Sequence, residues 1–170
     1  MQADETPDET VAGPVAALSP LHPNQIKVLR FRVIIAALVA VGVTMVLDIG
    51  PLQDTPLPRG LVPGAAALLG LIGIALLPGR RYRAWGYREG TDELFVKHGL
   101  FKRVLTVVPF GRVQHIDISQ GPVERRYGLG TLSLHTAGTR SAEVSLPGLA
   151  QDDAEAMRDR IRAQIRQDLV

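Results

Sequence analysis

The sequence predicts an α+β membrane protein. A hairpin of two membrane-spanning helices comes first, followed by a small bent antiparallel sheet or partial barrel capped by a C-terminal α-helix. Two long apolar runs occupy the first half of the chain, and short segments of alternating apolar and polar residues fill the second half. The final segment repeats apolar residues at spacings of three and four. These patterns are typical of membrane helices, half-buried strands and an amphipathic helix, respectively.

Composition restricts the class of protein. The 170 residues include 46% hydrophobic and 21% charged side chains, so the apolar residues must be concentrated in particular segments. The chain contains no cysteine, which excludes disulfides and thiolate metal sites. The formal net charge of +2 hides a segregation, because the first 20 residues carry only acidic charges while residues 80–130 are rich in arginine. We expect residues 1–25 to be an acidic, disordered tail.

Residues 26–79 are predicted to form the membrane hairpin, with helices over about 31–50 and 61–78. The unbroken apolar runs are Val33–Leu47 and Leu61–Leu77, near the length that crosses a bilayer. Two buried helices of a soluble protein are the first alternative, which the lack of a polar face and the small chain disfavour. A cleaved signal sequence is the second, and the late position of the first run disfavours it.

Small residues spaced four apart predict where the two helices touch. They are Ala36 and Ala40 in the first run, and Ala66 and Gly70 in the second. Such spacing permits close approach of helices in lipid.

The charges that flank the two runs predict the orientation of the hairpin. Lys27, Arg30 and Arg32 precede the first run, and Arg80, Arg81 and Arg83 follow the second. The connecting loop, Asp48–Gly60, holds Arg59 alone among basic residues. The positive-inside rule then places both termini in the cytoplasm. The expected location is the bacterial cytoplasmic (inner) membrane, crossed more than once.

Residues 80–170 are predicted to form a cytoplasmic domain. The expected strands are Tyr82–Arg88, Leu94–His98, Val104–Val108, Val113–Ser119, Leu129–Thr136 and Ala142–Leu146. A short helical insert, Pro122–Tyr127, is bounded by Gly121 and by Gly128, which can adopt a left-handed conformation. The last helix runs from Ala150 to about Leu169, and its apolar stripe is Ala154, Met157, Ile161, Ile165 and Leu169.

Much of the core is expected to come from apolar residues that share one face of these elements. They are Trp85, Leu94, Val96, Val107, Ile116, Ile118, Leu132, Leu134, Val144, Leu146, Met157 and Ile161.

The segment from Val108 to Gly138, VPFGRVQHIDISQGPVERRYGLGTLSLHTAG, carries a resemblance to a known family. Its valine-proline strand end, Arg-Val-Gln strand, Gln-Gly-Pro, aromatic-Gly-Leu helix end and closing Thr-Ala-Gly are similar to the membrane-anchored bacterial pleckstrin-homology-like (PH-like) domain family, YdbS-like. The resemblance covers roughly half of the chain. It implies a PH-like barrel with a C-terminal helix, and a scaffold or accessory role in the membrane.

Candidate catalytic residues are few. His115 and Asp117 share a strand face, and His98 and His135 are candidates to lie nearby, so an acid–base pair or a metal site is one hypothesis. The alternative is a solvent-facing polar side of a sheet whose other side holds Ile116 and Ile118. No metal-binding histidine spacing, phosphate loop or nucleophile elbow occurs in the sequence. We therefore expect no catalytic residue, no metal and no cofactor.

Basic residues are the other candidates, as contacts for lipid or for a partner: Arg80, Arg81, Arg83, Arg112, Arg125 and Arg126. For the first three we expect the main role to be setting topology, with anionic lipid as a further contact. Eukaryotic PH domains bind inositol phosphates with a basic loop between their first two strands. The corresponding loop here, Arg88–Glu93, leans acidic, which argues against that activity. The modest basic patch and the few aromatics argue against nucleic-acid binding.

The sequence thus favours a non-enzymatic, membrane-anchored binding or assembly module. The expected partners are the bilayer and either a second copy or a sister PH-like membrane protein. The alternative hypothesis is a sensor of anionic lipid head groups that uses the arginines named above.

Overall fold

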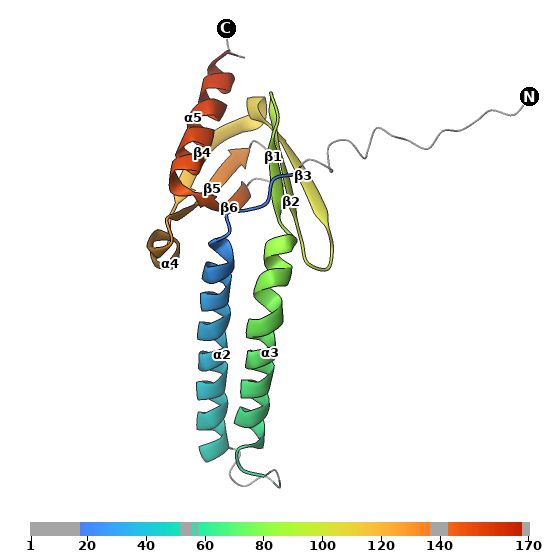
Figure 1. The fold of residues 1–170 in the computed structure, drawn as a ribbon, viewed down its shortest axis with the longest axis vertical. Helices are drawn as coiled ribbons and strands as arrows, with labels where there is room; N and C mark the ends of the chain where they lie inside the picture. Colours follow the sequence, from blue (N-terminus) through green and yellow to red (C-terminus); the bar gives the residue numbers. More distant parts are fainter. Residues whose placement is uncertain (1–17, 52–55, 57, 137–142, 168–170) are drawn as a thin grey trace, which may run out of the picture.

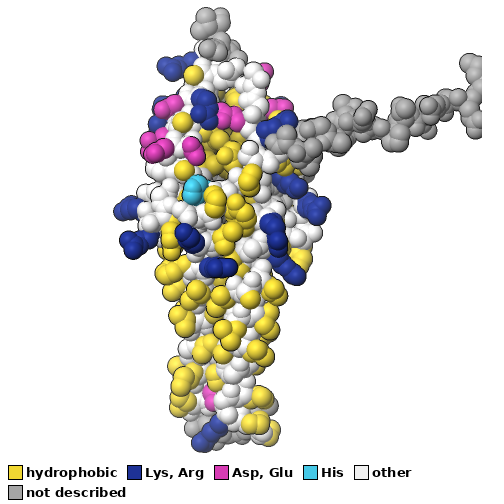
Figure 2. All heavy atoms as spheres, viewed as in Figure 1, with side chains coloured by type: hydrophobic (Ala, Val, Ile, Leu, Met, Phe, Trp, Pro, Cys, Tyr) yellow, Lys and Arg dark blue, Asp and Glu magenta, His cyan; other side chains and the backbone are white. Residues whose placement is uncertain are grey.

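The computed structural model describes residues 18–51, 56, 58–136 and 143–167. Two long helices, α2 (Gln25–Ile49) and α3 (Leu61–Arg83), lie side by side and carry a compact domain at one end (Figure 1). Apolar side chains cover most of the helix pair, and lysine and arginine side chains gather at its upper end (Figure 2). The apolar windows of the helices are only 0% and 6% buried within the structure. Helices this apolar and this exposed require a lipid environment, which excludes the alternative of a soluble core.

The two helices contact each other through small residues. A Cβ added to Gly70 would lie 2.9 Å from the Cβ of Ala37, so only glycine permits this approach. The prediction is confirmed for Gly70 on α3 and wrong for α2, because Ala36 and Ala40 are exposed. Adjacent helix positions are rotated by about 100°, so an error of one residue moves the contact off the interface.

Two three-stranded antiparallel sheets form the domain. The first has the order β1 (Gly86–Glu89), β2 (Glu93–His98), β3 (Val104–Pro109), and the second has the order β4 (Val113–Ser119), β5 (Leu129–Thr136), β6 (Glu143–Ala150). A 3₁₀ turn, η1 (Phe110–Arg112), joins the sheets, and the short helix α4 (Pro122–Arg126) joins β4 to β5. Helix α5 (Gln151–Gln167) packs against the second sheet and η1. Gly128 ends α4 with φ of 66°, as its position predicted.

Two strand boundaries differ from the prediction by more than one residue. Tyr82 and Arg83 belong to α3, because its hydrogen bonding continues to Ala84, and the first strand starts only at Gly86. The last strand does not stop before Pro147 but runs to Ala150. The register of β5 against β6 shifts between Gly130 and Thr131, and this irregularity accommodates the proline within an edge strand. Ala142 lies outside the described residues.

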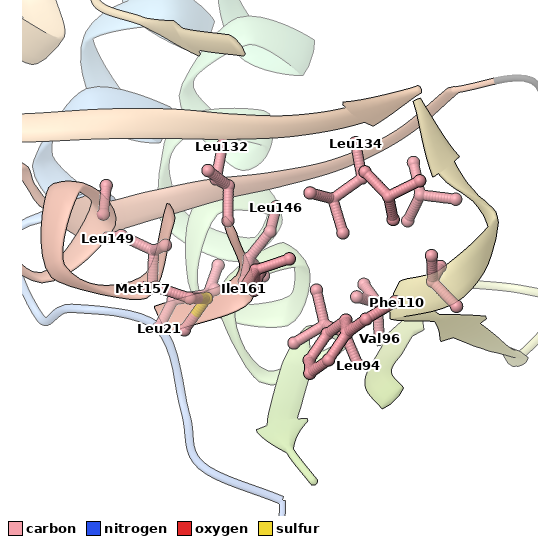
Figure 3. Close-up of a cluster of buried hydrophobic side chains, with 14 residues drawn as sticks. Leu21, Leu94, Val96, Phe110, Leu132, Leu134, Leu146, Leu149, Met157 and Ile161 are labelled. Carbon is pink, nitrogen blue, oxygen red and sulfur yellow. The ribbon is translucent and has the colours of Figure 1, made fainter. Parts of the chain in front are cut away.

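The core lies between the two sheets and α5 (Figure 3). Of the predicted core residues, Leu94, Val96, Leu132, Leu134, Val144, Leu146, Met157 and Ile161 are buried, whereas Trp85, Ile116 and Ile118 pack against the core partly exposed. Val107 was predicted wrongly. It is 42% exposed, and its neighbour Val108 is buried instead. Because side chains alternate along a strand, an error of one residue exchanges the two faces. Phe110 and Leu21 are buried without having been predicted.

The segment before α2 belongs to the domain. Ser19 pairs with Tyr87 through two backbone hydrogen bonds of 2.7 and 3.0 Å, and the Tyr82 hydroxyl donates to the Leu21 carbonyl at 2.7 Å. Disorder was therefore wrongly predicted for residues 18–25, and residues 1–17 of the predicted tail lie outside the described residues. Both long helices thus join the domain directly, without a linker.

Candidate functional site

A hollow lined by charged side chains lies between β4 and α5. Its volume is about 680 Å³. Its lining residues are Val113, Gln114, His115, Ile116, Arg158, Asp159, Arg162, Ile165 and Arg166. We call it the β4–α5 groove.

One wall of the groove is the edge of a sheet. Strand β4 pairs with β5 on one side only, and no strand within the described residues pairs with its other edge. Such an edge presents backbone N–H and C=O groups that can take up a further strand. An extended segment of another protein is therefore a natural occupant of this wall.

The other wall carries arginines at a helical spacing. Arg158, Arg162 and Arg166 are each four residues apart, so they share one face of α5. The adjacent face, rotated by about 100°, holds Met157 and Ile161, which are buried in the core, and this packing leaves the arginine face along the side of α5 that borders β4.

Charge in the groove is mainly positive. Arg158 Nε donates to Asp159 Oδ1 at 2.9 Å. This hydrogen bond raises the pKa of Arg158 and lowers the pKa of Asp159, so both groups remain charged at neutral pH. Three arginines face one carboxylate among the lining residues, so the groove suits an acidic ligand.

The predicted arginines lie elsewhere, in separate places. Arg80, Arg81 and Arg83 are exposed in the last turn of α3, within the belt of basic side chains at the upper end of the helix pair (Figure 2). Arg125 and Arg126 are exposed on α4. They do not meet Arg112, because that residue precedes β4 and α4 follows it, which places them at opposite ends of a seven-residue strand.

Helix α4 is held beside the start of α2. Arg32 on α2 donates to Glu124 Oε1 at 2.5 Å, and the other oxygen of Glu124 accepts the Gly121 N–H at 2.8 Å. The ammonium of Lys27 lies 5.7 Å from the centre of the Tyr127 ring. The side chain of Glu124 is 10% exposed and that of Arg32 is 58% exposed. This contact fixes Arg125 and Arg126 at the level of the first turns of α2.

Two of the histidines and the aspartate of the catalytic hypothesis lie close together, but their side chains are partly or largely exposed to solvent. His115 Nε2 lies 2.8 Å from Asp117 Oδ1, and His135 Nε2 lies 3.2 Å from Asp117 Oδ2. All three side chains are on the solvent face of the second sheet, whereas His98 stacks on Trp85 in the first sheet at 5.2 Å between centroids. In the part of the chain that the structure describes, no group of three or more His, Cys, Asp or Glu is arranged to hold a metal ion.

Sequence reasoning missed the groove arginines. Their spacing of four on the polar side of a predicted amphipathic helix was visible, and it is also the ordinary pattern of a solvated face. Only the fold shows that an open strand edge lies alongside them.

Comparison with known proteins agrees with this architecture. The family model described as "Bacterial PH domain" matches residues 30–165. The chain is 33% identical over 143 residues to the UPF0699 transmembrane protein YdbS of Bacillus subtilis (strain 168), which covers 83% of this chain and 88% of the relative. No solved structure matches the chain.

Proposed function

The chain belongs to the bacterial PH domain family of membrane proteins, and from this premise we propose that it is a non-enzymatic, membrane-anchored binding or assembly module. Its domain holds an acidic, extended segment of a protein partner in the β4–α5 groove. The partner is a sister PH-like membrane protein or a second copy of this chain. The observation that carries this proposal is the open edge of β4 beside the arginine face of α5.

The hairpin supplies the anchor in this proposal. Helices α2 and α3 each cross the bacterial cytoplasmic membrane once, and residues 18–24, 84–136 and 143–167 belong to the cytoplasmic domain. The support is the distribution of charge, since Arg30, Arg32 and the arginines that end α3 all lie at the domain end of the helices. At the far end, the Asp48 carboxylate accepts the Gly60 N–H at 2.9 Å. The groove then opens to the cytoplasm at the end of the domain away from the membrane helices, where the C-terminal half of α5 lies (Figure 1).

Site-specific photo-crosslinking in native membranes tests the groove as the binding site. A photoreactive residue at Gln114, which is exposed on β4 and lines the groove, is expected to yield a discrete protein adduct. The matched control is Ser119, an exposed residue of the same strand that does not line the groove, and it should yield little adduct. Equal adducts from both positions, or none from either, would contradict the assignment.

A second candidate function is recognition of anionic lipid head groups. The observation that favours it is the placement of the exposed Arg125 and Arg126 beside the first turns of α2. Each basic side chain near an anionic surface contributes about 1 kcal/mol.

Lipid selectivity of the full chain in mixed-lipid nanodiscs tests this second function. If the arginines read head groups, Arg125→Glu/Arg126→Glu lowers the enrichment of anionic lipid, and raising salt from about 0.05 to about 0.5 M does the same. The groove substitutions Arg158→Glu/Arg162→Glu serve as the control and leave it unchanged. Enrichment that resists both the substitution and the salt excludes the lipid function.

A further inference from the structure

The turn between β2 and β3 carries an aromatic side chain that is fully exposed to solvent. Phe101 is 100% exposed, and Leu100 beside it is also exposed. Lys102 and Arg103 follow directly, both exposed. A fully exposed phenylalanine next to a leucine is costly in water, so this apex has the composition of a surface that meets an apolar phase.

Strand register places this apex at the level of the membrane helices. Gly86, the first residue of β1, pairs with Lys97 on β2, and α3 ends at Arg83, just before β1. Beyond Lys97 the chain therefore continues back along α3. The four residues to Phe101 span up to about 13 Å at roughly 3.3 Å per residue. The last turn of α3, which holds Arg80, is only about 5 Å long. Figure 1 shows the tip of this hairpin reaching down beside the upper end of α3.

The base and the turn of the hairpin are both fixed. His98 stacks on Trp85, with 5.2 Å between ring centroids, which holds the end of β2 against the start of the first sheet. Gly99 has φ of 114°, and a Cβ there would collide with the carbonyl oxygen of Lys102. The turn is therefore tight at Gly99, and Leu100 and Phe101 form its apex.

We propose that this apex, Leu100–Arg103, is a membrane-contact element. Phe101 and Leu100 enter the boundary between head groups and acyl chains of the leaflet around α3, and Lys102 and Arg103 bind anionic head groups there. An apolar tip with basic neighbours is the composition that binds at this depth. The occupant is the same bilayer that the helices require, because the apex lies beside them.

The contact gives the domain a defined tilt. Helix α4 contacts α2 through the Arg32–Glu124 ion pair, and the β2–β3 apex lies at the level of the upper end of α3 (Figure 1). Two contacts on the two sides of the helix pair hold the domain against the bilayer, which fixes the direction in which the β4–α5 groove opens.

Depth-dependent fluorescence quenching of the full chain tests the proposal. The chain lacks cysteine, so Lys102→Cys and Thr91→Cys each provide a single labelling site for an environment-sensitive fluorophore. Thr91 is exposed in the β1–β2 turn, at the opposite end of the same sheet. The protein is reconstituted in vesicles of phosphatidylcholine with a minor fraction of phosphatidylglycerol, with nitroxides attached near the head groups or along the acyl chains.

The label at 102 is expected to emit at shorter wavelength than the label at 91 and to be quenched severalfold more strongly by lipid nitroxides. Adding Phe101→Ser to the Lys102→Cys protein should remove most of this quenching, and because Phe101 has no buried contact the fold is retained. Equal quenching of both labels by aqueous iodide would overturn the proposal. So would a short-wavelength emission at 102 that lipid nitroxides do not quench, which would indicate a protein contact instead.

Discussion

Replacing Ile161 with alanine is expected to lower the free energy of unfolding of the domain by about 2–5 kcal/mol. Ile161 is 0% exposed and belongs to the cluster that joins α5 to both sheets. Truncation removes buried methyl groups and leaves a cavity that the strands on either side cannot fill. The single tryptophan, Trp85, packs against this core, so its fluorescence reports unfolding of the full chain in detergent or nanodiscs.

Ile165→Ala is the matched control for this substitution. Ile165 lies one turn further along α5 and is only partly buried, so the same truncation should cost at most about 2 kcal/mol. If the two substitutions lower the free energy of unfolding by the same amount, α5 does not pack on the core through Ile161. The position of α5 as a wall of the groove would then be wrong.

Reversing two charges in the groove, Arg158→Glu/Arg162→Glu, is expected to reduce the yield of the protein adduct formed from position 114 by roughly tenfold to thirtyfold. Each reversal removes an ion pair between a groove arginine and the acidic segment of the partner. An exposed pair of this kind contributes up to about 1 kcal/mol, and a total of about 2 kcal/mol corresponds to roughly thirtyfold in affinity. Raised salt should also lower the adduct yield of the unaltered protein, because salt screens exposed ion pairs.

The control for this pair of reversals is Arg125→Glu/Arg126→Glu. It changes the net charge of the domain by the same amount, at a site on α4 that does not line the groove. The adduct should be retained in this variant. Equal loss in both variants would mean that the partner responds to the overall charge and not to the groove.

The sequence predicted the architecture because each element had its own periodic signal. Helices α2 and α3 were evident from unbroken apolar runs, which have few explanations besides a membrane. The strands from β2 to β5 were evident from alternation of period two, and α5 from apolar residues three and four apart. The resemblance added the name of the fold, which local periodicity alone does not provide.

The errors occurred at positions where tertiary contacts determine which of several similar residues is buried or lies at a contact. Val107 and Val108 are both strand residues with equal propensity, and only packing selects Val108 for the core. Ala36, Ala37 and Ala40 are equally small, and the rotation of α2 against α3 selects Ala37. Leu21 appeared to belong to a polar tail, yet its backbone and side chain complete the domain.

The candidate site was less predictable than the fold. Arg125 and Arg126 could be named from sequence, but their position beside α2 depends on the Arg32–Glu124 contact between residues 92 positions apart. The groove depends on β4 and α5, which are distant in sequence, and the exposure of Phe101 depends on the tight turn at Gly99. Residues of this kind acquire a role only when the chain is folded.

The most direct test of a membrane-anchored binding module is affinity purification of the tagged full-length protein from native membranes in mild detergent, with proteins and lipids both quantified by mass spectrometry. The unaltered protein is compared with Arg158→Glu/Arg162→Glu and with Arg125→Glu/Arg126→Glu. We expect a stoichiometric protein partner that is lost only from the groove variant. Enriched anionic lipid without a stoichiometric protein, lost only from the Arg125→Glu/Arg126→Glu variant, would contradict it and support the lipid-binding function.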